Sequence, residues 1–270
     1  MATIDTNGGG RLHAAIAGAG RPLVLVHGWS LSHRAFAPQL SQLAAGFRVI
    51  APDLRGHGAS RSPELARTVD DFAGDLAAVL AALDVEDALV AGWSWGAEIA
   101  LAALPSVRDR LAGLALISAT PRFTAGEGWE HGLPESRVRA LRARLARAPD
   151  DTRRAFFDAM FADGELDPAA KDRLAAEQLA VPPDVGAARA ALDALAAADL
   201  RDRLAPAREL PVLLVHGDAD GVCLPGASAW LAAQLPRSRR AVLAGVGHAP
   251  QLSRPEAVSA LVAGFAEELA

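Results

Sequence analysis

The pentapeptide Gly92-Trp93-Ser94-Trp95-Gly96 decides how this chain is expected to fold. An apolar run at 88–91 precedes it, and a segment of helix-forming residues at 97–104 follows it. A serine with a glycine two residues away on each side is typical of a strained turn between a buried strand and a helix. The turn lifts the hydroxyl above the sheet, and the helix N-terminus points N–H groups towards it. We therefore expect Ser94 to be a nucleophile; the alternative is a glycine turn with an incidental serine.

Outward from this turn, short apolar runs alternate with helical segments. Strands are predicted at 22–26, 47–51, 88–91, 111–118, 211–216 and 241–244, and helices at 69–83, 97–104, 226–235 and 255–269. Such alternation favours an α/β fold, with a mostly parallel sheet flanked by helices. The alternation stops over 121–198, where charged helical segments show no clear strand. We expect a core of 1–120 and 199–270 with 121–198 inserted as a helical lid.

A serine nucleophile needs a base, and the base needs an anionic partner. His248 follows the last predicted strand, on a loop where this topology would place a base. Asp220 lies on the loop after 211–216 and is the preferred partner, with Asp218 as the alternative and a turn-forming role for the other aspartate. The order Ser94, Asp220, His248 is the order expected of a hydrolase built around such a turn.

The oxyanion of an acyl-transfer reaction needs two N–H donors. We expect the backbone N–H of Trp95, next to the nucleophile, and that of Trp29, in the His27-Gly28-Trp29 loop. The Trp29 and Trp95 side chains are expected to form pocket walls.

Composition excludes several function classes. The 270 residues carry a net charge of −5 and are 51% hydrophobic, which permits a large core and disfavours nucleic-acid binding. No signal peptide or apolar stretch of membrane-spanning length is seen, so a cytoplasmic location away from membranes is expected. A monomer is expected.

Other reactive residues lack a supporting pattern. Cys223, the single cysteine, is interpreted as a packed thiol. His27 is expected to order its loop and His216 to be packed, whereas His13, His33 and His131 are interpreted as surface residues. There is no H-E-x-x-H, no paired cysteine and no G-x-G-x-x-G after the first strand, so neither a metal nor any other cofactor is expected.

The motifs together resemble the α/β-hydrolase superfamily. They are more closely similar to the pimeloyl-[acyl-carrier protein] methyl ester esterase family in the stretches 27–31, 92–96, 118–123, 199–201 and 247–250. The resemblance implies a serine esterase that acts on a methyl ester carried by acyl-carrier protein, with Ser94, Asp220 and His248 as the triad. Ala97, Trp95 and much of 121–198 depart from the family pattern, which leaves the acyl group open.

The insertion contains two further groups of candidate residues. Seven arginines stand against two aspartates within 137–154, and the resemblance implies that lid arginines bind the acidic carrier protein: Arg137, Arg139, Arg142, Arg144, Arg147, Arg153 and Arg154. The alternative is a solvated helix. Aromatic residues could line an acyl tunnel or form the core of the lid, and we expect Phe123 and one of Phe156 or Phe157 to contact substrate.

Two alternative functions remain open from the sequence. One is another enzyme with the same triad, such as a broad short-chain carboxylesterase, a perhydrolase or a carbon–carbon bond hydrolase. The other is a non-catalytic receptor that uses the same pocket.

Overall fold

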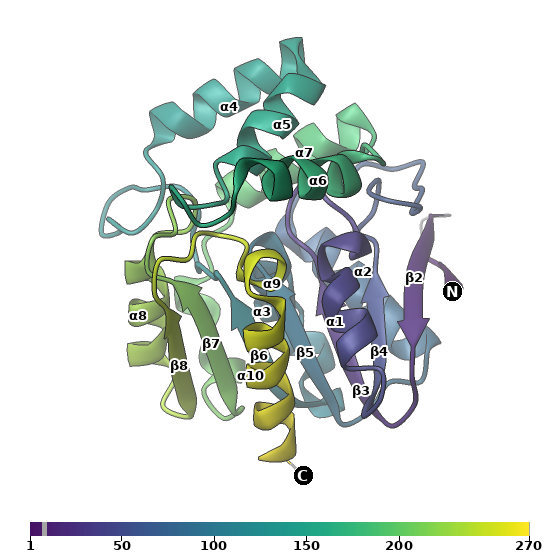
Figure 1. Ribbon diagram of the computed structural model, residues 1–270. Coiled ribbons are helices and arrows are strands. Elements are labelled where there is room, and N and C mark those ends of the chain that lie inside the picture. The colour runs from purple at the N-terminus through teal and green to yellow at the C-terminus, as the bar shows by residue number, and fades with distance from the viewer. Residues whose placement is uncertain (7–9, 270) are drawn as a thin grey trace.

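The computed structural model describes residues 1–6 and 10–269, in which eight strands form one sheet (Figure 1). The strand order is β1-β2-β4-β3-β5-β6-β7-β8, and the six strands from β4 to β8 run parallel. Their bounds are β1 Ala2–Asp5, β2 Arg11–Ala17, β3 Arg21–Val26, β4 Phe47–Pro52, β5 Ala88–Trp93, β6 Leu111–Ile117, β7 Val212–Gly217 and β8 Ser238–Leu243. All six predicted strands are present, and the prediction of a mostly parallel sheet is confirmed.

The two N-terminal strands were missed by the sequence analysis. β2 pairs antiparallel with β4, with Ala14 opposite Pro52, and β1 pairs antiparallel with β2 at the sheet edge. β2 reads Arg-Leu-His-Ala-Ala-Ile-Ala, and alanine has weak β-propensity. The alternation of apolar and polar residues that marks a strand is therefore weak in β2, and its strand conformation depends on pairing with β4.

Helices cover both faces of the sheet, and alternate side chains of each strand serve the two faces. Along β3, Val24 and Val26 join the hydrophobic cluster under α2 (Val69–Ala82), α3 (Trp95–Val107) and α8 (Pro225–Gln234). Leu23 and Leu25 join the opposite cluster under α1 (Ala37–Gln42), α9 (Pro250–Ser253) and α10 (Pro255–Glu267). Figure 1 shows α1, α9 and α10 together in front of the sheet.

Two predicted boundaries were wrong. α3 continues past Pro105 to Val107, because proline in the last turn removes only one helical hydrogen bond. β8 begins at Ser238 instead of Ala241, and its exposed Arg239 and Arg240 hid it from a search for apolar runs. Charged residues of this kind are common on edge strands, where they discourage pairing with another chain.

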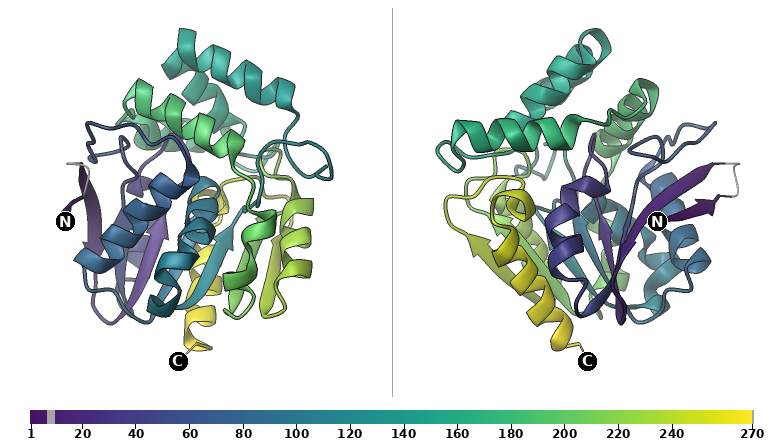
Figure 2. Two further views of the ribbon diagram at one scale, coloured as in Figure 1. Left: turned by 180° about the vertical axis from the view of Figure 1, so that it is seen from behind. Right: turned by 45° about the vertical axis from the view of Figure 1, so that its right-hand side comes forward.

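Four helices between β6 and β7 lie above the carboxyl edge of the sheet (Figures 1 and 2). They are α4 Glu135–Arg147, α5 Pro149–Asp158, α6 Pro168–Leu179 and α7 Val185–Ala197. The two ends of this insertion meet, because Leu200 N donates to Pro121 O (2.8 Å) and Thr124 Oγ1 donates to Ala196 O (3.0 Å). No helix in 1–6 or 10–269 is both long and apolar enough to span a membrane.

Candidate active site

The backbone at Ser94 is strained, and Gly92 and Gly96 leave the space that this turn requires. Ser94 has a φ of +55°, a conformation that residues other than glycine rarely adopt. A Cβ on Gly96 would lie 2.0 Å from Val26 O, and one on Gly92 would lie 2.4 Å from Gly96 O. Ser94 N donates to Ile117 O (2.9 Å), which ties the turn to the neighbouring strand. The close backbone approach therefore requires glycine at both positions and holds the hydroxyl at the carboxyl end of β5.

Three side chains from distant parts of the chain form one hydrogen-bonded line. His248 Nε2 is 2.9 Å from Ser94 Oγ, and His248 Nδ1 is 2.9 Å from Asp220 Oδ2. All three residues are buried. Because an ionised carboxylate only accepts, the proton between His248 and Asp220 belongs on Nδ1. Nε2 is then free to accept the Ser94 proton, which is the arrangement that a serine nucleophile requires.

The loop after β7 distinguishes the two candidate aspartates. Asp220 Oδ1 accepts from Val222 N (2.8 Å) and Cys223 N (2.9 Å), so its second oxygen faces His248. Burial by itself would raise the pKa of Asp220, but the charge of His248 and hydrogen bonds from His216 and His248 outweigh it and lower that pKa. Asp218 is exposed and accepts from Gly245 N (2.7 Å), a turn-forming role.

His216 is buried, as its place at the end of a strand predicted, but it also contacts the carboxylate. Its Nε2 lies 2.8 Å from Cys223 O and 3.2 Å from Asp220 Oδ2. A proton on this Nε2 can be shared between the two acceptors. His216 therefore contacts the same Asp220 oxygen that faces His248.

The His248 loop is fastened by residues that the sequence analysis did not identify. Trp93 Nε1 donates to His248 O (2.8 Å), and His248 N donates to Met160 O (2.6 Å). The buried Glu165 accepts from Gly247 N (2.8 Å) through Oε2. Met160 and Glu165 belong to the insertion and lie more than 80 residues before the loop that they hold. No local pattern in the sequence marks them.

The two predicted oxyanion donors lie beside the nucleophile. Trp95 is the first residue of α3, and a Cβ on Gly28 would lie 3.3 Å from Ser94 Cβ, which places the Trp29 loop against Ser94. Within the described residues, no hydrogen bond uses the backbone N–H of Trp29 or Trp95. The Trp29 side chain is held separately, since its Nε1 donates to Ala188 O of α7 (2.8 Å). Both N–H groups are therefore available to a bound oxyanion.

The insertion covers the site. Ser94 is only 7% exposed. The half-buried Phe156 packs edge-on against Trp29, with ring centroids 4.9 Å apart, while Phe123 is buried in the same hydrophobic cluster as Trp29. Phe157 is fully buried against Phe161 in the opposite cluster. Phe156 therefore suits the predicted pocket wall better than Phe157.

The seven lid arginines have different surroundings. Arg153 does not fit the predicted docking group, because its side chain is buried and its Nε donates to Ser30 Oγ (3.1 Å). Arg142 pairs with Asp193, and Arg154 pairs with two aspartates. The other four are exposed on α4 and make no ion pair within the described part of the chain: Arg137, Arg139, Arg144 and Arg147.

The remaining sequence candidates occupy packed positions. Cys223 is buried, and burial together with the Asp220 charge raises the pKa of its thiol, so a thiolate nucleophile is disfavoured. His27 links two loops, since its Nδ1 lies 2.8 Å from Gly28 O and its Nε2 accepts from Leu54 N (2.9 Å). The surface interpretation of His13, His33 and His131 was wrong, because all three are half-buried.

Comparison with known proteins agrees with this geometry. Residues 21–255 match the family model described as alpha/beta hydrolase fold. Two proteins named "Pimeloyl-[acyl-carrier protein] methyl ester esterase" are similar over most of their length. The one from Nitrosomonas europaea is 31% identical over 91% of this chain and 95% of its own length. The one from Aromatoleum aromaticum is 34% identical over 89% of this chain and 96% of its own.

A solved structure shares the architecture. The esterase EaEST from Exiguobacterium antarcticum has a TM-score of 0.92 and 25% identity, over 98% of both chains. The predicted fold and the resemblance to the esterase family are both confirmed by these matches.

Proposed function

The chain belongs to the alpha/beta hydrolase fold family and is a carboxylic ester hydrolase, and from this premise we propose that it hydrolyses the methyl ester of a pimeloyl group carried on acyl-carrier protein. The observation that supports the catalytic part of this proposal is the pair of hydrogen bonds that link Ser94 Oγ to His248 and His248 to Asp220. The named activity of similar proteins supports the substrate.

In the first step, Ser94 Oγ attacks the ester carbonyl carbon while His248 Nε2 takes the hydroxyl proton. The carbonyl π electrons move to oxygen, and the oxyanion accepts hydrogen bonds from the Trp29 and Trp95 backbone N–H groups. As the carbonyl reforms, the bond to the methoxy oxygen breaks, and the protonated His248 gives its proton to that oxygen. Methanol leaves and an acyl-serine remains.

In the second step, water attacks the acyl-serine. His248 accepts a proton from the water, a second oxyanion forms in the same place, and the bond to Ser94 Oγ breaks as that oxygen regains its proton. The products are the free carboxylic acid and the restored serine. Asp220 stays ionised throughout and stabilises the positively charged His248 that forms in both steps.

The carrier-protein part of the proposal rests on α4. Val138 and Leu145 face inwards, so residues on the far side of the helix face solvent. Arg137 and Arg144 are seven residues apart, and Arg147 is three further on, so the three share one side of the helix. None is neutralised by an ion pair within the described residues. An acidic carrier protein would be attracted to this row beside the covered site.

We propose that residues 121–198 act as the lid of this site. The Trp29–Ala188 and Ser30–Arg153 hydrogen bonds fasten it to the loop beside Ser94. Opening requires these bonds to break and the Phe156–Trp29 contact to separate. Phe156 and Phe123 would then contact the acyl chain.

The test compares the carrier-linked ester with the free methyl ester of the same acid, with methanol release as the readout. We expect Ser94→Ala to abolish release from both substrates. Charge reversal at Arg137, Arg144 and Arg147 should raise KM for the carrier-linked ester at least tenfold and leave the free ester unaffected. Arg208→Glu is the matched control, because Arg208 is exposed just before β7, at the opposite edge of the sheet.

Two other outcomes would redirect the assignment. Equal kcat/KM for carrier-linked and free esters would favour a broad short-chain carboxylesterase. No turnover of either ester by a folded protein, without labelling of Ser94 by a fluorophosphonate, would favour the receptor alternative. The monomeric state and cytoplasmic location stay predictions.

A further inference from the structure

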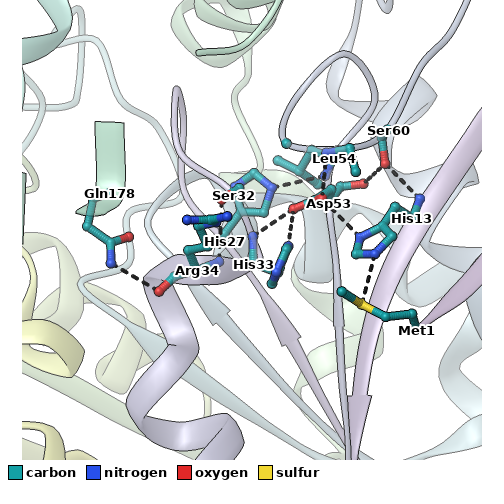
Figure 3. Close-up of polar contacts among 12 residues, drawn as sticks. Met1, His13, His27, Ser32, His33, Arg34, Asp53, Leu54, Ser60 and Gln178 are labelled. Atoms are coloured by element: carbon teal, nitrogen blue, oxygen red, sulfur yellow. Dashed lines mark hydrogen bonds and ion pairs between the residues drawn. The ribbon is translucent and has the colours of Figure 1, made fainter. Parts of the chain in front are cut away.

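A second polar cluster, separate from the triad, is formed by residues from three parts of the fold. Asp53 directly follows β4, His13 lies on β2, and His33 begins the short helix that follows the Trp29 loop. One ligand atom from each of the three residues lies within 4.8 Å of the others. Figure 3 shows both imidazole rings directed at the Asp53 carboxylate.

Asp53 is held as a rigid anion. Its Oδ1 accepts from His33 N (2.7 Å) and its Oδ2 accepts from Ala59 N (2.8 Å). A Cβ on Gly58 would lie 2.3 Å from Asp53 Cγ, so the backbone presses directly on the carboxyl group.

The carboxylate has one acceptor site left on each oxygen, because two of its four lone-pair positions are taken by backbone N–H groups. His33 Nδ1 lies 2.9 Å from Oδ1, and His13 Nδ1 lies 3.1 Å from Oδ2. Each remaining position is therefore directed at one imidazole nitrogen.

The contacts of His13 favour positive charge beside its Nδ1. Its Nε2 lies 3.1 Å from Met1 Sδ, while its Nδ1 faces the carboxylate. A thioether and a carboxylate are both acceptors, whereas a neutral imidazole has one N–H. If the proton lies on Nε2, the Nδ1 lone pair faces an anion, and either a proton or a bound metal ion between Nδ1 and the carboxylate removes the repulsion.

We propose that His13, His33 and Asp53 bind a divalent cation of the zinc type through both Nδ1 atoms and an Asp53 oxygen. Two imidazoles and one carboxylate form a ligand set that suits zinc, whereas calcium and magnesium prefer oxygen ligands. Zinc bonds of about 2.0–2.1 Å place the ligand atoms of a tetrahedral site about 3.3–3.4 Å apart. His33 Nδ1 lies 2.9 Å from Asp53 Oδ1 and His13 Nδ1 lies 3.1 Å from Asp53 Oδ2, and one ligand atom of each residue lies within 4.8 Å of the others, so small side-chain rotations would bring the three ligands to these separations.

The two rings leave a route for the ion. The His13 and His33 side chains are 16% and 18% exposed, while Asp53 is fully covered. A cation can therefore enter from solvent between the rings, and water can supply a fourth ligand. Met1 contacts the opposite nitrogen of His13 and does not compete for the ion.

The ion would act on the loop beside the nucleophile. His33 continues the segment that carries Trp29 and Ser30, and Arg34 O accepts from Gln178 Nε2 of α6 (3.1 Å) (Figure 3). The segment thus connects the cluster to three helices of the insertion. Metal binding would fix this segment to β2 and β4 and stabilise the covered form of the site.

No metal site was expected from the sequence, because the three residues do not form a contiguous motif. His33 lies 20 residues after His13, and Asp53 lies 20 residues after His33. Their proximity results from the antiparallel pairing of β2 with β4, in a strand that the sequence did not predict.

The test is isothermal titration of chelator-treated full-length protein with Zn²⁺ alone, with thermal unfolding as a second readout. We expect one equivalent to bind and Tm to rise. His13→Ala and His33→Ala should each weaken binding at least tenfold and remove the rise in Tm. His131→Ala is the control, since this half-buried histidine packs on Trp129, away from the cluster. The two histidine variants are chosen because Asp53 also accepts backbone bonds that folding requires.

Four results would overturn the proposal. These are no saturable binding at one equivalent, undiminished binding by His33→Ala, undiminished binding by His13→Ala, and equal loss in His131→Ala. Circular dichroism of each variant in chelator separates loss of a ligand from loss of the fold. Ester hydrolysis is not needed as a readout, so failure of this proposal leaves the proposed function untouched.

Discussion

Replacement of Asp220 by asparagine should disable His248 as a base, although residue 220 can still form a hydrogen bond to it. The Asn oxygen can keep the bonds from Val222 N and Cys223 N, which turns the amide NH₂ towards His248. His248 Nδ1 must then accept, so the imidazole proton moves to Nε2 and Ser94 can no longer give up its own proton. The equivalent change in a serine protease lowers kcat by about 10⁴, or about 5 kcal/mol.

We therefore expect Asp220→Asn to lower kcat for methyl ester hydrolysis about 10⁴-fold at neutral pH, with little change in KM. Asp218→Asn is the matched control, because Asp218 lies two residues away on the same loop but is exposed, and its carboxylate accepts from Gly245 N instead of facing His248. Its kcat should stay within a factor of two or three of the wild type. Retention of more than a tenth of the activity by a folded Asp220→Asn protein would refute the triad assignment, as would an equal loss in Asp218→Asn.

Three further predictions concern the surroundings of the triad. Glu165→Ala should lower kcat about 10–100-fold, because the Gly247 N–H loses its acceptor and the loop that carries His248 shifts. Glu165→Gln keeps an acceptor for this N–H and should retain most activity. Equal kinetics for the two variants would contradict the positioning role of Glu165. Burial, helped by a neighbouring imidazole, lowers the pKa of His27 to about 4 from an ordinary value of about 6.5. The unfolded chain binds this proton at higher pH than the folded one, so the free energy of unfolding should fall by about 3 kcal/mol as pH drops from 6.5 to 4, as measured by urea titration. His27→Gln should flatten that slope, and an unchanged slope would show that other groups cause it. Gly96→Ala should unfold at least about 3 kcal/mol more easily, since its Cβ would lie 2.0 Å from Val26 O; a Tm within two degrees of wild type would be inconsistent with this contact.

The sequence was sufficient to predict a structural feature wherever its physical cause lies within a few neighbouring residues. The glycines around Ser94 are needed because backbone atoms approach within about two ångströms of where a Cβ would stand, and that requirement is visible in five residues. The apolar runs of β3 and β5 are buried on both faces, so they read as continuous hydrophobic stretches. The search for apolar runs failed for β2, because its alanines have weak β-propensity. It also missed the start of β8, because this edge strand carries exposed arginines there.

What the sequence determined by itself is the order of the chemical groups: a serine on a strained turn, an aspartate after a later strand, and a histidine after the last one. The tertiary structure decided which of Asp218 and Asp220 faces His248, because two backbone N–H groups orient only one of them. It also decided that Glu165 and Met160 hold the base loop, and that His13, His33 and Asp53 meet. These contacts join residues 20 to 88 positions apart, so they depend on how strands pair and helices pack, and no short stretch of sequence encodes that.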